Sequence, residues 1–236
     1  MTQAVASAPL IVICVLDYAT SVEILDGVAD LTGKTVANLS SLAPDEVTAF
    51  AEVIARRGGE FVDGSIICYP QSIGTDEGSV LYSGAPEAWA RHEATLMAVG
   101  ASSAYVSEMV TASCVLNLGL VGAFFTTALS AFVECATFVL KQGVDPELLA
   151  GLTPLTVDFL GRTAVDAVAE IAEGHFETRE ATIDTYLTGM EPALLCLEAG
   201  GIQPRVVAGA LENLRQASAA GLGSLGFAAQ AKVVGA

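Results

Sequence analysis

Tyr69, Pro70 and Gln71 follow directly on residues 60–68 (EFVDGSIIC), a run with the composition of a buried β-strand. In open α/β sheets, ligands bind beyond the carboxyl ends of the strands. An aromatic ring, a proline and an amide at such a position can line a cleft for a small molecule. The same residues also suit an ordinary turn after a strand, so the segment alone leaves both interpretations open.

Asn38, Ser40 and Ser41 stand at the end of a second strand-like run, residues 34–39 (KTVANL). Their amide and hydroxyl groups suit hydrogen bonds to a ribose or a phosphate. Alternatively, the serine hydroxyls satisfy nearby backbone groups before the next helix.

Asn117 is the strongly polar side chain near the start of residues 109–133, an apolar run without any charged residue. A buried amide costs free energy unless it is hydrogen-bonded, either to the backbone of a packed helix or to a ligand in a cleft. An amide does not titrate near neutral pH, so Asn117 cannot be a general acid. In a cleft it would orient a substrate or a water molecule.

Gly221, Gly223 and Gly226 spell G-x-G-x-x-G. The dinucleotide-binding fingerprint must follow a strand and open a helix within a βαβ unit. Here the glycines follow a helical pattern near the end of the sequence. We therefore interpret them as a flexible loop that closes over a neighbouring site.

The 236 residues include 27 acidic and 10 basic side chains, a formal net charge of −17. This charge repels phosphate backbones and argues against nucleic-acid partners. Five cysteines without a C-x-x-C pair indicate reduced thiols in a cytosol, and two isolated histidines argue against a zinc site. The first residues, MTQAVASAP, lack the basic region of a signal peptide. We expect a cytoplasmic protein without a metal.

Strand-like and helix-like segments alternate in the first part of the sequence, which predicts βαβ units and a parallel sheet. The expected strands are residues 9–16, 34–39, 60–68 and 79–83; the expected helices between and after them start near residues 20, 44 and 86. After residue 104 only helices are expected, namely the long apolar one, a short one from 146, and 153–173, 182–199 and 204–220. The predicted domains are residues 1–104 and 105–236. The first strand is apolar on both faces yet has no predecessor to pair with, so its edge needs a cover.

The long apolar helix, residues 109–133, has the length of a membrane span. Its polar residues and the absence of flanking Lys or Arg argue against that alternative. We expect a helix buried on all sides by protein, with no membrane partner.

The run DGSIICYPQSIGTDEGSVLYSG, residues 63–84, resembles the imine reductase branch of the β-hydroxyacid dehydrogenase superfamily. Imine reductases have a D-G-x-I-x-x-x-P-x-x-I-G-type run followed by L-x-Y-S-G. The matching residues are Asp63, Gly64, Ile66, Pro70, Ile73, Gly74, Leu81, Tyr82, Ser83 and Gly84. Residues 181–194 (ATIDTYLTGMEPAL) resemble a C-terminal helix of the same family, so the resemblance covers nearly the whole chain.

The resemblance implies an α/β fold with a truncated Rossmann-type parallel sheet, a long interdomain helix and an all-helical dimerisation domain. Such proteins begin with a strand, a Gly-rich loop and further βα units that hold NADPH, and no match to those units precedes residues 9–16. The resemblance therefore implies NADPH as the family's hydride donor but weak or absent NADPH binding by this chain. It also implies an interlocked homodimer and a small-molecule substrate.

Individual positions are assigned by the same resemblance. Asn117 corresponds to the position where hydroxyacid enzymes carry a catalytic lysine and imine reductases often carry aspartate or tyrosine. The cofactor-facing positions are Leu16, Asp17, Tyr18, Asn38, Ser40 and Ser41. The positions that line the substrate cleft are Tyr69, Pro70, Gln71, Phe125, Phe159 and Met190.

Three functions are compatible with these features. The first is an imine-reductase-like oxidoreductase, acting on a C=N bond of a small cyclic or secondary imine, with a defective cofactor site. The second is a repurposed cleft that binds, cyclises or isomerises a small apolar molecule without NADPH. The third is a structural or partner-binding fragment. The strand-end motif favours the first two, and the missing match to a Gly-rich loop favours the last two.

Overall fold

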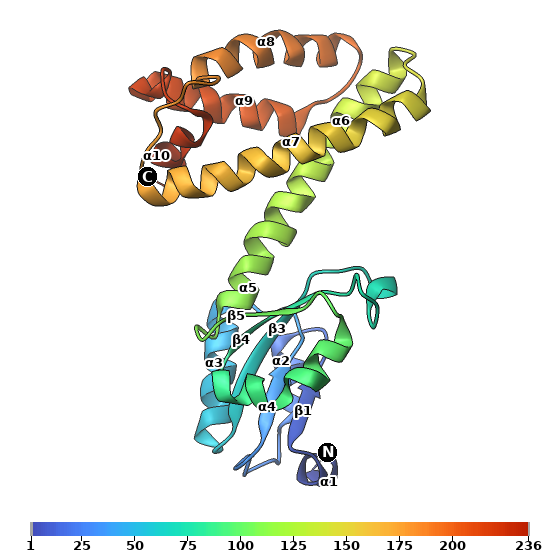
Figure 1. Ribbon diagram of the computed structural model, residues 1–236, viewed down its shortest axis with the longest axis vertical. Helices are drawn as coiled ribbons and strands as arrows, with labels where there is room; N and C mark the ends of the chain where they lie inside the picture. The colour runs from blue at the N-terminus through green and yellow to red at the C-terminus, as the bar shows by residue number, and fades with distance from the viewer. Residues whose placement is uncertain (1, 236) are drawn as a thin grey trace. The chain divides into compact units, whose positions relative to one another are not determined.

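The computed structural model describes residues 2–235, and the chain divides into two compact units, Met1–Phe125 and Thr126–Ala236. Figure 1 labels the elements along the chain. The first unit contains α1 (Thr2–Ser7), β1 (Leu10–Ile13), α2 (Tyr18–Ile24), β2 (Thr35–Asn38), α3 (Pro44–Arg56), β3 (Glu60–Ile66), β4 (Val80–Gly84), α4 (Pro86–Leu96), β5 (Ala104–Ser107), α5 (Ala112–Leu116) and a π-helix (Asn117–Phe125). The second contains α6 (Thr126–Lys141), α7 (Pro146–Glu173), α8 (Ile183–Ala199), α9 (Arg205–Ala217), a π-helix (Ser218–Leu222) and α10 (Ala231–Val234).

The first unit is built on a five-stranded sheet of order β1-β2-β3-β4-β5, which confirms the α/β class. The pairs β1–β2, β2–β3 and β4–β5 are parallel, but β3–β4 is antiparallel, so the expectation of an all-parallel sheet is wrong at that pair. The connection from β3 to β4 contains only the short 3₁₀ helix Pro70–Ser72. A parallel crossover needs a dozen or more residues, usually with a full helix, and the chain turns back instead.

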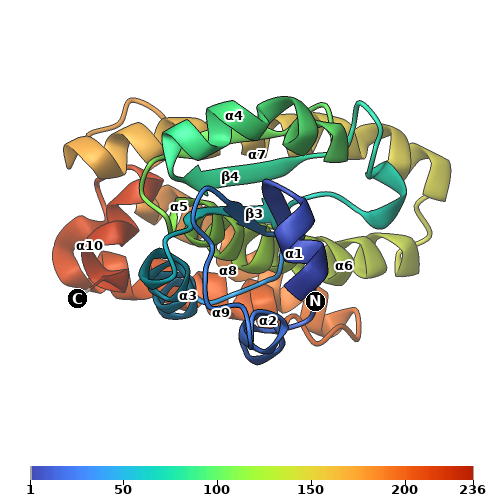
Figure 2. The ribbon, with the colours of Figure 1, turned by 90° about the horizontal axis from the view of Figure 1, so that it is seen from below.

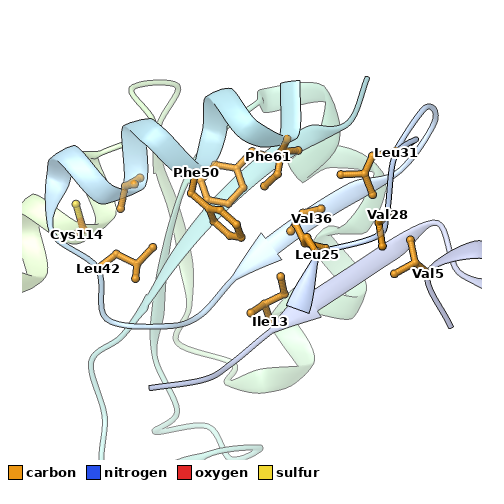
Figure 3. Packing of buried hydrophobic residues seen from close by; sticks show 12 residues of the cluster. Val5, Ile13, Leu25, Val28, Leu31, Val36, Leu42, Phe50, Phe61 and Cys114 are labelled. Carbon is orange, nitrogen blue, oxygen red and sulfur yellow. The ribbon is translucent and has the colours of Figure 1, made fainter. Parts of the chain in front are cut away.

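Helices cover both faces of this sheet, and side chains alternate between the two faces along each strand. Val36 and Phe61 point to the face covered by α2 and α3, where Phe50 and Leu25 complete the core shown in Figure 3. Ala37, Val62 and Tyr82 point to the other face, where they pack against Trp89 and Leu96 of α4. In Figure 2, α4 lies on one side of β3 and β4 and α3 on the other.

Some boundaries differ from the expected ones for local reasons. Helix α2 is capped by Asp17, whose carboxylate accepts a hydrogen bond from the Thr20 N–H (2.8 Å), and so begins earlier than predicted.

Strand β5 was not predicted, because it has only four residues and two of them are exposed. Since β5 pairs with β4, the sheet extends beyond the predicted domain boundary at residue 104, and the compact units divide at Phe125. Strand β1 stands at one end of the strand order.

The second unit is helical, as predicted. Helices α8 and α9 match the expected ranges closely, whereas the two helices expected from residues 146 and 153 are one helix, α7. Asp145 caps α7 through the N–H groups of Glu147 and Leu148, and Pro154 lies within its length without ending it. The unit's core is formed by residues of α8, α9, the connection from α7 to α8 and the last turns, namely Phe176, Ile183, Leu214, Ala217, Ala228 and Ala229.

The long apolar helix forms, but not in the predicted surroundings. Ala112–Lys141 is continuous through the π-helix, and it is the one described helix with the length and hydropathy to cross a membrane. None of its most apolar window is buried within the chain. The prediction that protein covers this helix on all sides is therefore wrong for a single chain.

Candidate functional site

A row of polar residues crosses the middle of the sheet. In strand register, Asn38 of β2 stands beside Asp63 of β3, and Asp63 stands beside Ser83 of β4. Neighbours in register share a face of a sheet, so all three side chains lie on the face that carries α3 and α5. Asn38 and Ser83 are fully buried and Asp63 is 1% exposed.

Ser113 of α5 closes this row into a hydrogen-bonded network. Its hydroxyl donates to Asp63 Oδ2 (2.6 Å), while the Asn38 amide donates to Asp63 Oδ1 (3.1 Å). The Ser83 hydroxyl donates to the Val110 carbonyl (2.9 Å) and lies 2.8 Å from Ser113 Oγ, and the Ser113 N–H donates to Ser83 Oγ (3.1 Å). The start of α5 is thereby hydrogen-bonded to β3 and β4, and through Asp63 to Asn38 of β2.

Gly64, the residue after Asp63, lies where the opposite face of the sheet is closely packed. A Cβ at position 64 would lie 2.4 Å from Leu39 Cδ2 and 2.9 Å from Tyr82 Cε1 on the opposite face. The absence of a side chain at position 64 therefore lets Leu39 and Tyr82 pack closely on the face opposite Asp63.

Burial raises the pKa of Asp63, and the hydrogen bonds from Ser113, Asn38 and the Gly64 N–H oppose that rise. Cys114, next to Ser113, has its pKa raised to about 11 by burial and by the nearby Asp63 charge. The Cys114 thiol is therefore neutral near pH 7 and is no activated nucleophile.

The segment after β3 carries the predicted cleft residues at the surface. Tyr69 is 63% exposed, and Pro70 and Gln71 are exposed as well. The Gly74 N–H donates to the Val99 carbonyl (2.7 Å), which pins the loop at its far end. The three side chains are accessible to a ligand, and their contact with a substrate stays a prediction.

Leu16, Asp17 and Tyr18, the three residues that lie just before and at the start of α2, differ in exposure and contacts. Leu16 is 87% exposed, and its side chain is free to meet a ligand. Asp17 caps α2, and the Thr20 hydrogen bonds lower its pKa. The Tyr18 ring packs edge-on against Phe50, with centroids 6.1 Å apart.

The residues after β2 divide into two buried side chains and one exposed. The Asn38 amide donates to Asp63 and to the Ser40 carbonyl, and Ser40 Oγ accepts from the Val15 N–H (2.9 Å). Ser41 is exposed. Cofactor contact at these positions stays a prediction. The side chains of Asn38 and Ser40 instead satisfy internal groups, which is the alternative left open for Ser40.

Asn117 begins the π-helix, one turn after Ser113. Its side chain is half-buried and makes no recorded hydrogen bond to another residue in the range 2–235. π-Helices are rare and often mark functional sites. The exposed Phe125 ends the same π-helix.

The other two predicted cleft residues belong to the second unit. Phe159 of α7 is exposed, whereas Met190 of α8 packs against that unit's core. Their assignment to a cleft stays a prediction.

The glycine-rich segment is anchored against the start of α8. The Ser218 hydroxyl donates to Asp184 Oδ1 (2.6 Å), and the Gly226 N–H donates to the Phe176 carbonyl (2.7 Å). A Cβ on Gly223 would lie 2.4 Å from Asp184 Oδ1. Because of these contacts the glycine-rich segment is a packed turn, and the expectation of a flexible loop is wrong. The segment does not stand at the start of a βαβ unit.

All four basic side chains of the first unit lie where the strands β1–β3 begin. Lys34 donates to the carbonyls of Ala6 and Ala8, and Arg91 pairs with Glu60, the first residue of β3. Arg57 donates to the Leu25 carbonyl, and Arg56 pairs with Glu52. Residues 2–125 therefore place no cation at the carboxyl ends of these strands, where NADPH phosphates would need one. They also contain no group of three metal-ligating side chains.

Sequence reasoning missed two members of the buried network, Ser83 and Ser113. Ser83 was matched only as part of the L-x-Y-S-G run, without a role, and Ser113 stood in an apolar run where its spacing gave no signal. The usable signal was the position of Ser83, four residues into a strand that follows the Asp63-containing strand.

Comparisons with known proteins agree with the fold and the motif. The chain is 28% identical over 200 residues to an NADPH-dependent reductive aminase from Aspergillus oryzae, a match that spans 81% of this chain and 66% of that protein. It aligns with an imine reductase structure from Pseudomonas sp. at 27% identity and a TM-score of 0.87, covering 99% of this chain and 82% of the other.

A reductive aminase from Aspergillus terreus in complex with NADPH and ethyl levulinate has the same fold, with a TM-score of 0.86 at 24% identity over 99% of this chain and 81% of the other. Residues 111–236, more than half of the chain, match the family model for the C-terminal domain of NADPH-dependent reductive aminase-like proteins. The chain belongs to the NADPH-dependent reductive aminase-like family.

Proposed function

We propose that the chain forms the substrate side of an imine reductase or reductive aminase site acting on a C=N bond of a small cyclic or secondary imine. The observation that carries the proposal is the half-buried Asn117, whose amide has no recorded partner among residues 2–235 and which opens a π-helix in a member of this family. When bound, NADPH supplies the hydride. Because an amide does not titrate near pH 7, Asn117 orients the imine or a water molecule and donates no proton.

The described residues fit only part of NADPH. Exposed groups at the carboxyl ends of the strands, including Leu16 and Ser41, suit a nicotinamide and its ribose. The pyrophosphate and the 2′-phosphate need free helix N–H groups or basic side chains. At α2 the Asp17 carboxylate occupies the N-terminus, and the four cations of the first unit lie at the opposite ends of the strands. We therefore propose that residues 1–236 bind NADPH weakly or not at all.

The same lack of cations at the carboxyl ends favours a second candidate function. In it, the cleft binds a small apolar molecule and cyclises or isomerises it without NADPH. The exposed Tyr69 and Leu16 would then supply an apolar wall.

We also propose that the protein is a cytoplasmic homodimer. The five cysteines are all free. Helices α6 and α7 have no buried residue and expose large apolar side chains, among them Leu129, Phe132, Leu155, Val157, Phe159, Val165 and Val168. A patch of this kind on a soluble protein marks an interface, and burying it against a second copy requires no other partner.

The test is the oxidation of NADPH by the purified chain in the presence of a cyclic imine. At about millimolar NADPH, the concentration that weak binding requires, the first candidate predicts imine-dependent oxidation that is lost in Asn117→Ala. Conversion of an apolar substrate at the same rate with and without NADPH would support the second candidate instead.

A further inference from the structure

Asp63 is a buried carboxyl group that the proposed chemistry does not use. Within residues 2–235 no basic side chain pairs with it: the groups that face it are the Ser113 hydroxyl on Oδ2, the Asn38 amide on Oδ1 and the Gly64 N–H. Among residues 2–235, the other titratable group that senses its charge is the Cys114 thiol of α5. A charged group buried without a counter-ion destabilises the fold, so its presence calls for a task beyond stability.

The network around Asp63 controls where the helix of Asn117 begins. Ser113 bonds to Asp63 on one strand and to Ser83 on the next, and Ser83 also holds the Val110 carbonyl just before α5. No capping side chain is present at Thr111, so these bonds to the sheet replace the usual helix cap.

Asn117 follows Ser113 by four residues, and residues four apart lie on the same face of a helix, about 6 Å apart. A shift of Ser113 therefore moves Asn117 with little attenuation. The loop with Tyr69 continues directly from β3, the strand that carries Asp63. One carboxyl group thus connects the element that carries the amide to the strand that carries the exposed loop.

We infer that Asp63 is a positioning residue, which acts through Ser113 to fix the orientation of the Asn117 amide relative to the loop at Tyr69–Gln71. This inference deepens the proposed function and rests on it.

The hydrogen bond between residue 63 and Ser113 can form with either residue as the donor. This allows one variant that keeps the bond and another that removes it. With Asp63 ionised, the Ser113 hydroxyl donates to it. With an amide at position 63, the Nδ2 group donates to Ser113 Oγ, Ser113 donates to Ser83, and Ser83 keeps its bond to Val110. Asp63→Asn therefore retains the link, whereas Ser113→Ala breaks it in either direction.

The experiment measures imine reduction at saturating imine and millimolar NADPH in Ser113→Ala, Asp63→Ala and Asp63→Asn. We expect kcat to fall about tenfold or more in the first two, because small losses of alignment cost one to two orders of magnitude in rate. KM for the imine should stay within about threefold, and Asp63→Asn should keep kcat within about threefold. The matched control is Ser130→Ala, which removes an exposed hydroxyl bonded to Thr126 on α6 of the same long helix.

A second readout is independent of activity. The side-chain ¹⁵N amide resonance of Asn117, assigned by its loss in Asn117→Ala, should shift or broaden in Ser113→Ala and stay in place in Asp63→Asn and Ser130→Ala. If the wild-type chain reduces no imine, the proposed function fails while this resonance still decides the positioning role. An unchanged Asn117 resonance in folded Ser113→Ala would overturn the inference, as would an unchanged kcat.

Discussion

At the residue scale, the main feature of the site is a carboxyl group buried in the interior of a sheet. Asp63 is satisfied by three hydrogen bonds and not by a counter-ion, and burial still raises its pKa above the ordinary value of 3.8. Its folded pKa therefore lies above its unfolded pKa, so the folded chain binds more protons than the unfolded chain between the two values. The contribution of Asp63 to stability is present at low pH and is lost as the pH rises through the folded pKa.

This sign predicts the behaviour of Asp63→Asn. The variant cannot ionise, so its free energy of unfolding relative to wild type should increase from about pH 4 up to the folded pKa and stay constant above it. Urea denaturation of both proteins over a pH series measures the difference, which cancels the contributions of the other carboxylates. In Ser113→Ala, which lacks one of the bonds that lower the pKa, the decline of stability should continue to higher pH. A difference that shrinks as the pH rises would contradict the assigned direction of the shift.

At the element scale, the two units show how much local sequence determines. Strands at residues 34–39 and 60–68 and helices with Pro at their first turn were predictable, because apolar runs and N-terminal signals are local features. The antiparallel β3–β4 pair was not, since it depends on the length of a connection that the sequence left ambiguous. Strand β5 forms because it pairs with β4. This interaction is nonlocal, and the four partly exposed residues of β5 carry no local sequence signal for it.

Helix α9 provides a test of such a nonlocal contact. Its N-cap, Pro204, offers no side-chain acceptor, and the Glu134 carboxylate of α6 accepts hydrogen bonds from the Val206 and Val207 N–H groups (3.0 and 3.2 Å) instead. Glu134→Ala should lower the free energy of unfolding by about 1–2 kcal/mol, the usual effect of losing a helix cap. Thermal or urea denaturation measures it. Glu198→Ala, an exposed carboxylate on α8, should change stability by less than about 0.5 kcal/mol. Equal losses in the two variants would show that Glu134 does not cap α9.

At the scale of the whole molecule, the motif in residues 63–84 led to the correct family, but the roles of its residues were not readable from it. Asp63 and Ser83 were matched as letters of a pattern, and the structure shows them as members of one buried network with Ser113. Asn38 was expected at the cofactor; its side chain is buried and donates to Asp63, and its contact with a cofactor stays a prediction. Polar side chains at strand ends look alike in sequence whether they face a ligand or satisfy the backbone.

The exposed apolar helices give a whole-molecule prediction. If α6 and α7 form the dimer interface, Leu155→Glu combined with Val168→Glu should convert the protein to a monomer or leave it insoluble, because two charges would be buried without partners. Sedimentation measures the change. Gln142→Glu, at the exposed end of α6, should leave the dimer intact. A wild-type chain that is a monodisperse monomer would contradict the dimer proposal, and extraction only into detergent would support the membrane alternative.

We propose that these 236 residues carry the substrate side of the site but lack the groups that bind the cofactor phosphates. Calorimetric titration of the purified chain with NADPH tests it most directly. Losing the phosphate contacts should cost several kcal/mol, and each 1.4 kcal/mol corresponds to about tenfold in affinity. We therefore predict a Kd of about 1 mM or weaker, decreasing little at low salt, since residues 2–125 place no cation at the carboxyl ends of β1–β3. Binding at about micromolar Kd by the chain alone would contradict the account.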